Sequence, residues 1–79
     1  MDQSDRPQPA LGKAVRQLRE KQGDSQEALA SKAGTTTGTV GMIERGQANP
    51  AWDTVKRIAT ALGVSMGQLA TLSDKLEDG

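Results

Sequence analysis

The chain has 79 residues, 10 of them basic and 10 acidic, and it contains no cysteine, histidine, tyrosine or phenylalanine. This length suits one small domain, and the missing cysteine and histidine exclude disulfides, thiolate or imidazole metal sites and His-based catalysis. We therefore expect no enzyme, no metal and no cofactor. Because no apolar run approaches the ~20 residues of a membrane span and the start is no signal peptide, we expect a soluble, cytoplasmic protein without a membrane partner.

Charge is distributed unevenly along the sequence. Residues 10–62 carry eight Lys or Arg and five Asp or Glu, a net charge of +3, which the acidic ends bring back to zero. A modestly basic body with acidic ends is compatible with DNA binding but does not require it.

The first three predicted helices follow a polar arm, residues 1–9 (MDQSDRPQP), which we expect to be disordered. Apolar residues at helical spacing predict one helix up to Gly23, a second up to Gly34 and a third up to Gly46. Glycine favours the left-handed conformation that commonly ends a helix. The expected buried positions of these helices are Leu11, Val15, Leu18, Ala28, Leu29, Ala33, Val40 and Ile43.

Polar residues just before the second and third helices are typical of N-caps. Asp24 or Ser25 can cap the second helix, and Glu27 stands three residues after Asp24 as in a capping box. Thr35 or Thr36 can cap the third helix. Two helices joined by a short turn with glycine are typical of a helix-turn-helix.

The last two predicted helices follow the loop GQANP. Pro50 lies near the first turn of the fourth helix, where its missing N–H costs nothing, and Gly63 ends that helix. Ser65 and Gln68 form a capping box that opens the fifth helix. No strand pattern occurs, so the fold is expected to be all-α. The expected buried positions here are Val55, Ile58, Ala59, Leu62, Leu69 and Leu72.

Four segments together resemble the phage repressor/Cro (XRE) family of helix-turn-helix DNA-binding proteins: LGKAVRQLRE, SQEALA, TTTGTVGMIERG and NPAWDTVKRIATALGVS. The resemblance implies a five-helix, lambda-repressor-like domain over residues 10–72, with the helix-turn-helix at about residues 26–45. Because residues 73–79 are polar and mostly charged, we expect them to form a frayed acidic tail. The resemblance also implies a transcriptional regulator, expected to be a repressor, that binds a palindromic double-stranded DNA operator as a homodimer.

The resemblance assigns DNA phosphate contacts to two groups of residues. Ser25 and Gln26 lie at the start of the second helix, where free N–H groups and the helix dipole favour an anion. Arg45, Gln47 and Asn49 lie at the end of the third helix and in the loop after it. Purely structural alternatives stay open: Ser25 only caps, Gln26 is solvated, or Asn49 caps the fourth helix. Arg45 could likewise only offset the helix dipole.

Arg19 and Glu44 match the family's pairing of an arginine on the first helix with a glutamate on the third. The resemblance implies an ion pair that clamps the third helix to the first and leaves the guanidinium edge near a phosphate. The alternative is two solvated charges on unrelated faces, since most surface pairs contribute little to stability.

The base-reading positions implied by the resemblance are Thr36, Thr37, Gly38 and Met42, and here the chain departs from the family. Long amide or cationic side chains, which usually read base edges, are missing. Gly38 and Gly41 on one expected exposed face indicate the close approach of another surface. Three interpretations of this face stay open. Thr and Met can contact the bases while DNA shape adds specificity, or water molecules can mediate the readout. Alternatively, the face docks a protein partner. The last would make the chain an antitoxin-like or anti-regulator module with weak or lost DNA binding.

Two apolar features complete the sequence-based expectations. Trp52 is expected in the core, because large apolar residues at helical spacing are mostly buried. Leu69, Leu72 and Leu76 form an apolar stripe near the C-terminus that is a candidate dimer contact. Alternatively Leu69 and Leu72 close the core and Leu76 is frayed.

Overall fold

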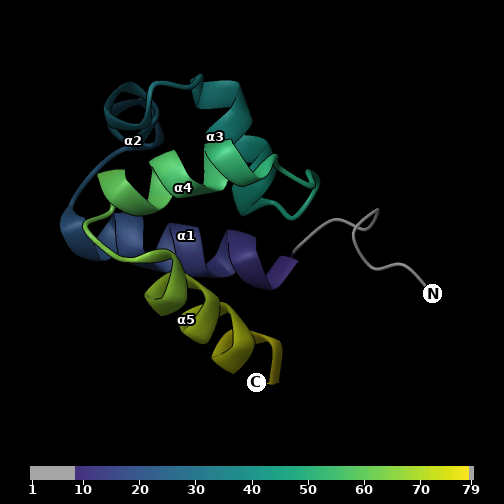
Figure 1. Ribbon diagram of the computed structural model, residues 1–79. Helices are drawn as coiled ribbons and strands as arrows, with labels where there is room; N and C mark the ends of the chain where they lie inside the picture. The colour runs from purple at the N-terminus through teal and green to yellow at the C-terminus, as the bar shows by residue number, and fades with distance from the viewer. Residues whose placement is uncertain (1–8, 79) are drawn as a thin grey trace.

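The computed structural model describes residues 9–78 and consists of five helices (Figure 1). No strand occurs among these residues, so the predicted all-α, five-helix class is confirmed. The expected disordered arm lies outside the described residues except for Pro9, which begins the first helix. The helices are α1 (Pro9–Gln22), α2 (Gln26–Ala33), α3 (Thr37–Glu44), α4 (Trp52–Ala61) and α5 (Met66–Asp78).

Short side chains fix the starts of α2 and α3. Ser25, rather than Asp24, is the N-cap of α2, and its hydroxyl accepts a hydrogen bond from the N–H of Ala28 at 3.0 Å. Of the two candidate threonines, Thr36 caps α3 and accepts from the N–H of Thr39 at 3.1 Å. Each cap satisfies one of the N–H groups that a helix start leaves without a partner.

The ends of α2 and α4 and the start of α5 follow the predicted signals. Gly34 adopts a φ of 70° after α2, and Gly63 a φ of 74° after α4, a conformation that glycine reaches without a Cβ penalty. The capping box of α5 is confirmed in both directions: the N–H of Gln68 donates to the Ser65 hydroxyl at 3.0 Å, and the N–H of Ser65 donates to the Gln68 side-chain oxygen at 2.8 Å.

Helix α5 continues to Asp78, beyond the expected limit at residue 72. The expectation of a frayed tail therefore differs from the structure. The reason is that Leu72 and Leu76, one turn apart, both pack against the core and extend the apolar face of the helix. The hydroxyl of Ser73 also donates to the carbonyl of Leu69 at 2.9 Å within the same helix.

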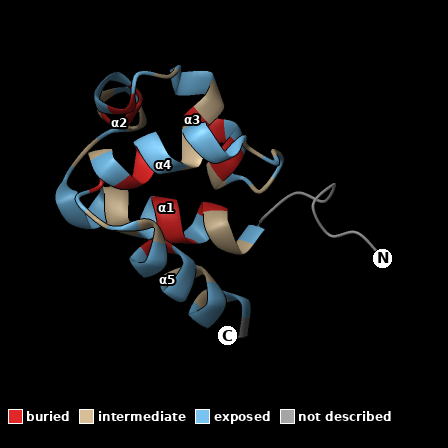
Figure 2. Cartoon of the chain, in the orientation of Figure 1, coloured by how far each residue is buried: buried red, intermediate tan, exposed pale blue. Residues whose placement is uncertain are grey.

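The core lies around α1, which packs against α3 on one side and α5 on the other, while α2 packs against α3 and α4 (Figures 1 and 2). The predicted inward positions are buried or packed at the edge of this core, except Ala28, which is only half-buried, and Trp52, which is exposed. Each helix contributes at least one fully buried large side chain. These are Val15, Leu29, Val40, Ile43, Ile58 and Leu69.

Gly12 allows α1 and α3 to approach closely. A Cβ at this position would collide with the carbonyl oxygen of Ile43 and lie 2.9 Å from that of Glu44. Both obstacles are backbone atoms of α3, which no side-chain rotation can move. The missing side chain of Gly12 therefore sets how the end of α3 sits on α1.

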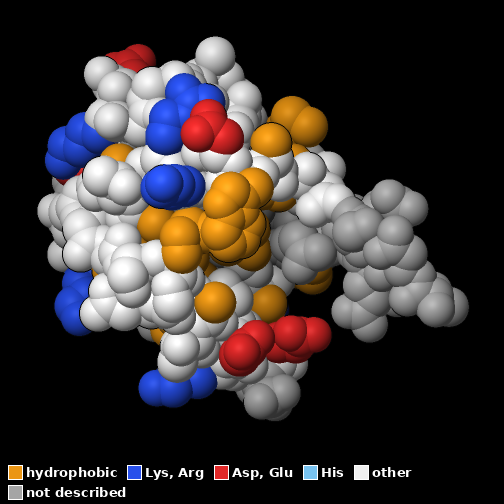
Figure 3. Space-filling model, viewed as in Figure 1, with side chains coloured by type: hydrophobic (Ala, Val, Ile, Leu, Met, Phe, Trp, Pro, Cys, Tyr) orange, Lys and Arg blue, Asp and Glu red, His pale blue; other side chains and the backbone are white. Residues whose placement is uncertain are grey.

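The position of Trp52 differs from the expectation. Trp52 is 72% exposed, so its expected place in the core is wrong. As the first residue of α4 it lies where the helix begins, at the edge of the core, and the inward face is filled by Val55, Ile58, Ala59 and Leu62. Hydrophobic side chains gather at the centre of one face between α4 and α5 (Figure 3).

The leucine stripe of α5 belongs to the core. Leu69 is 1% exposed, and Leu72 and Leu76 pack partly buried against the core. Leu69 and Leu72 therefore close the core, as the alternative predicted, and Leu76 lies in the helix rather than in a frayed tail. A dimer contact through the exposed parts of Leu72 and Leu76 stays a prediction. None of the helices described in residues 9–78 has the length and hydropathy of a membrane-spanning segment.

Candidate nucleic-acid interface

Helices α2 and α3 form a tight corner around Gly34 and Thr35. The N–H of Gly34 donates to the carbonyls of Ala30 and Ser31, and the N–H of Thr35 donates to that of Ala30 at 2.9 Å. These bonds use two of the carbonyls in the last turn of α2 and turn the chain directly into α3. The geometry is that of a helix-turn-helix pair, with α2 and α3 packed on each other.

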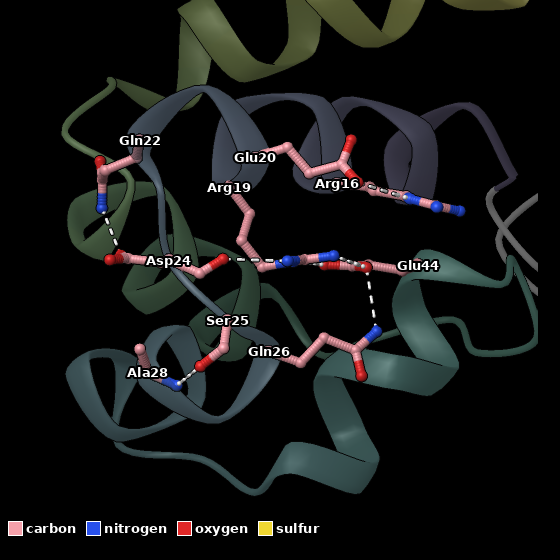
Figure 4. A network of polar contacts seen from close by, with 9 residues as sticks. All are labelled: Arg16, Arg19, Glu20, Gln22, Asp24, Ser25, Gln26, Ala28 and Glu44. Carbon is pink, nitrogen blue, oxygen red and sulfur yellow. Dashed lines mark hydrogen bonds and ion pairs between the residues drawn. The ribbon is translucent and has the colours of Figure 1, made fainter.

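Arg19 and Glu44 form the expected ion pair and join α1 to α3 (Figure 4). The guanidinium donates from Nε to one carboxylate oxygen at 2.6 Å and from Nη2 to the other at 3.0 Å, so the pair is bidentate. Its Nη1 donates to the carbonyl of Asp24 at 2.9 Å, and this bond connects the segment just before α2 to the ion pair. The Arg19 side chain is 12% exposed and that of Glu44 is 3% exposed, so the alternative of two solvated charges is wrong.

The electrostatics of this pair favour the charged forms of both groups. Burial alone would raise the pKa of Glu44, but hydrogen bonds from Arg19 and Gln26 and the positive charge of Arg19 outweigh it and lower that pKa below its ordinary value. The hydrogen bond to Glu44 raises the pKa of Arg19. A buried charge held this way is stable only while its partners are present.

Gln26 lies at the first position of α2 and is part of the same network. Its side-chain amide donates to the Glu44 carboxylate at 3.0 Å, so it is neither freely solvated nor wholly free for DNA (Figure 4). The amide has a second N–H, and the backbone N–H groups of the first helical turn lack partners within the helix. Gln26 thus connects the clamp to the end of α2 where an anion would be favoured.

The exposed face of α3 is smaller than the sequence suggests. Thr37 and Gly38 are exposed and Met42 is 45% exposed. Thr36 is exposed, but its hydroxyl accepts from the N–H of Thr39 and donates to the Thr39 hydroxyl at 2.9 Å. Of the four predicted base-side residues, Thr36 is therefore the one whose hydroxyl is already engaged.

Gly41 does not lie on that exposed face, which corrects the expectation of two exposed glycines. It is buried, and a Cβ there would lie 3.0 Å from the Arg45 guanidinium and 3.7 Å from the Gln26 side-chain oxygen. The guanidinium thus folds back over Gly41, because helical side chains at i+4 point toward the preceding turn. By contrast, a Cβ at Gly38 would meet only the Thr36 hydroxyl, at 3.9 Å.

The residues that follow α3 remain near its end. Arg45 is the C-cap of α3, and its Nε donates to the side-chain oxygen of Gln47 at 3.0 Å. Asn49 is exposed and does not cap α4, since the N-cap is Ala51 and makes no side-chain cap bond. The alternative of Asn49 as a structural cap is therefore wrong, while its phosphate contact stays a prediction.

Sequence reasoning missed two side chains near the interface. Arg57 of α4 donates to the carbonyl of Gly34 in the turn between α2 and α3 at 3.4 Å and pairs with Asp53 at 2.8 Å. The spacing of Asp53 and Arg57 by four residues is a signal for such a pair. Lys32 pairs with Asp24 at 2.8 Å, and nothing in the spacing of eight residues indicates it.

The described residues hold no cluster of His, Cys, Asp or Glu that could bind a metal ion. A helix-turn-helix family model matches residues 15–69. The chain is 33% identical over 69 residues to an uncharacterized HTH-type transcriptional regulator, y4dJ, from Sinorhizobium fredii, covering 87% of this chain and 90% of that protein.

Two solved structures have similar folds. The restriction-modification controller protein C.AhdI from Aeromonas hydrophila is 38% identical with a TM-score of 0.75, over 77% of this chain and 92% of that one. The clp gene regulator ClgR from Corynebacterium glutamicum is 25% identical with a TM-score of 0.83, over 86% and 72%. The family match spans most of the chain and coincides with the corner formed by α2 and α3, so the protein belongs to the helix-turn-helix family of transcriptional regulators.

Proposed function

We propose that the protein binds specific double-stranded DNA as a homodimer and represses transcription from the sites it binds. Helix α3 lies in the major groove, and α2 rests on the backbone. The observation that carries this proposal is the bidentate contact between Arg19 and Glu44, which fixes α3 while leaving Thr37, Gly38 and Met42 exposed. A recognition element held to a rigid scaffold places its contacts reproducibly.

Phosphate contacts come from both sides of α3 in this proposal. The start of α2, with Ser25 and Gln26, offers N–H groups and the positive end of a helix dipole. Arg45 supplies the positive charge, and Gln47 holds its guanidinium at 3.0 Å. Asn49 extends the contacts into the loop after α3. Such contacts position a protein on DNA without reading its sequence.

Base readout comes from small side chains in this proposal. Gly38 lets the α3 backbone approach the base edges, since only the Thr36 hydroxyl lies within 4 Å of a Cβ there. The methyl groups of Thr37 and Met42 suit contact with thymine methyls, and the Thr37 hydroxyl suits a direct or water-mediated hydrogen bond. With few bidentate contacts, part of the specificity comes from DNA shape.

Selection from a random duplex pool tests the proposal directly. With the purified chain at about 0.1 M salt, we expect an inverted repeat with half-sites roughly 34 Å apart. Affinity should fall steeply with salt, by a log–log slope of about −0.9 for each phosphate contacted. A folded protein that enriches no duplex contradicts the proposal and points to the protein-interaction alternative.

Two substitutions separate the assigned roles. We expect Arg45→Ala to weaken binding to all duplexes alike and to reduce the salt slope by about one contact. Lys75→Ala on α5, which removes the same charge away from α3, is the matched control and should leave the slope unchanged. Thr37→Ala should change which sequences are selected, and a uniform loss of affinity would instead remove Thr37 from the base-reading set. A reporter gene placed under the selected site tests repression.

A further inference from the structure

An exposed hydrophobic side chain and an apolar groove share one face of the molecule. Trp52 is 72% exposed and forms one wall of a groove of about 420 Å³ between α4 and α5. A groove of this size is comparable with pockets that receive whole small molecules, so it can receive an indole ring. Other apolar walls of the groove come from Leu11, Val55, Met66, Leu69 and Ala70.

Oppositely charged side chains lie on the two sides of this face. Lys56 lies one turn beyond Trp52 on α4, and Asp74 lines the groove from α5. Both are exposed, and no ion pair within the described residues includes either of them. Figure 3 shows the hydrophobic patch bordered by a basic side chain toward α4 and by acidic side chains toward the end of α5.

We propose that this face joins two copies of the chain, with Trp52 of each copy seated in the groove of the other. A two-fold axis brings the same patch of both copies together, so the patch must be complementary to itself. A protruding indole beside a hollow meets that condition. The same rotation carries Lys56 of one copy toward Asp74 of the second copy, so the bordering charges also match.

The apolar surface that the indole side chains and the groove walls can bury indicates a small interface. Two indole side chains supply roughly 150–250 Å² each, in addition to the groove walls that they cover. Stable complexes bury about 1,200 Å² or more in total. We therefore expect a reversible dimer that dissociates on dilution. The inference rests on the proposed function and deepens it, because it names the contact that brings two copies of α3 onto one DNA site.

Sedimentation of the full chain without DNA, over a range of concentrations, tests the contact. We expect the wild-type chain to dimerise and Trp52→Ala to weaken dimerisation about 30-fold or more, because buried tryptophans are typical interface hot spots. The Trp52 side chain is mostly solvated, so its removal should leave the fold intact. Met42→Ala, which truncates the other large hydrophobic residue that is exposed in residues 9–78, is the matched control and should leave the dimer unchanged.

Two further measurements test the geometry. Trp52 is the only tryptophan of the chain, so its fluorescence reports this face alone. Its emission should shift to shorter wavelength as concentration rises. Lys56→Asp and Asp74→Lys should each weaken the dimer by several-fold, and the double variant should recover most of that loss.

Several outcomes would overturn the inference: a wild-type chain that stays monomeric, a Trp52→Ala variant that dimerises like the wild type, or a double charge variant without recovery. These results are distinguishable from a failure of the proposed function. A wild-type chain that dimerises through Trp52 but enriches no duplex supports the contact and contradicts DNA binding alone. A chain that selects an inverted repeat while Trp52→Ala dimerises normally contradicts the contact alone.

Discussion

Glu44 and Trp52 stand close together in the sequence, but the side chain of Glu44 is 3% exposed and Trp52 is 72% exposed. The charged residue is inside and the aromatic one outside, the reverse of their usual distribution. Glu44 is tolerated inside because Arg19 and Gln26 together give it three hydrogen bonds. Trp52 has no equivalent place, because the residues that follow it in α4 already fill the inward face.

The difference separates two tasks within one small domain. Around Glu44, polar partners and the close contact at Gly12 fix the position of α3. Around Trp52, an apolar side chain remains available for another surface. Substitutions in the first region should therefore change the stability of the monomer, and those on exposed faces should mainly change what it binds.

The largest expected effect comes from Gly12→Ala. The new Cβ collides with the carbonyl of Ile43, so α1 and α3 must separate and lose packing along their length. Overpacking against backbone costs about 3 kcal/mol or more, a large part of the stability of a domain this small. Urea denaturation measures the loss. An unchanged midpoint would show that the two helices can shift apart freely.

Breaking the clamp should have the next largest effect. Arg19→Met or Glu44→Met leaves the other charge buried without its partner, at a cost of about 3 kcal/mol in the free energy of unfolding. The double variant removes both charges and should be more stable than either single variant. Denaturation of the four proteins gives a double-mutant cycle. If the single losses simply add up in the double variant, the two side chains act independently.

Acid should weaken the same region in a defined pH window. Although burial alone would raise it, the pKa of Glu44 is lowered in the fold by its partners, from an ordinary value of 4.5. Its contribution to stability is therefore complete above about pH 4.5 and is lost as the pH falls through the lowered folded pKa. Hydrogen bonds from Lys32 and Gln22 lower the pKa of Asp24 and act in the same direction.

Glu44→Gln isolates the share of Glu44 in that acid response. The variant should be less stable at pH 7, because Arg19 loses its counter-charge, but its stability should fall less steeply between about pH 5 and 3. Stability measured by urea denaturation at several pH values gives both slopes. Parallel slopes for wild type and variant would contradict the assignment.

Helix boundaries and the core were predictable because they depend on local patterns. The signals that start and end the helices act within a few residues: Gly34 and Gly63, the cap at Ser25, and the capping box of Ser65 and Gln68. The spacing of apolar residues predicted most of the buried positions. The contact of Arg19 with Glu44 came from resemblance, since no local rule connects residues 25 positions apart.

The remaining features depend on how helices meet in space. Trp52 has the spacing of a core residue, and its exposure follows from the place of the first turn of α4 at the edge of the core. Gly41 fits an exposed face until the Arg45 guanidinium folds over it. Gly12 carries no distinguishing signal in its own helix, because its constraint comes from the backbone of α3.

Gly38→Ala should give the smallest change in stability, and it tests whether the open face of α3 meets DNA. A Cβ there touches only the Thr36 hydroxyl at 3.9 Å, so the substitution should stabilise the helix by roughly 0.5–1 kcal/mol. If the backbone at Gly38 approaches base edges, however, the same methyl group must weaken DNA binding. Thermal melts and DNA titrations of one preparation measure the two effects together. A variant that is more stable and binds the selected site as tightly as the wild type would show that α3 does not approach DNA at Gly38, and Thr37 and Met42 would then carry the base contacts.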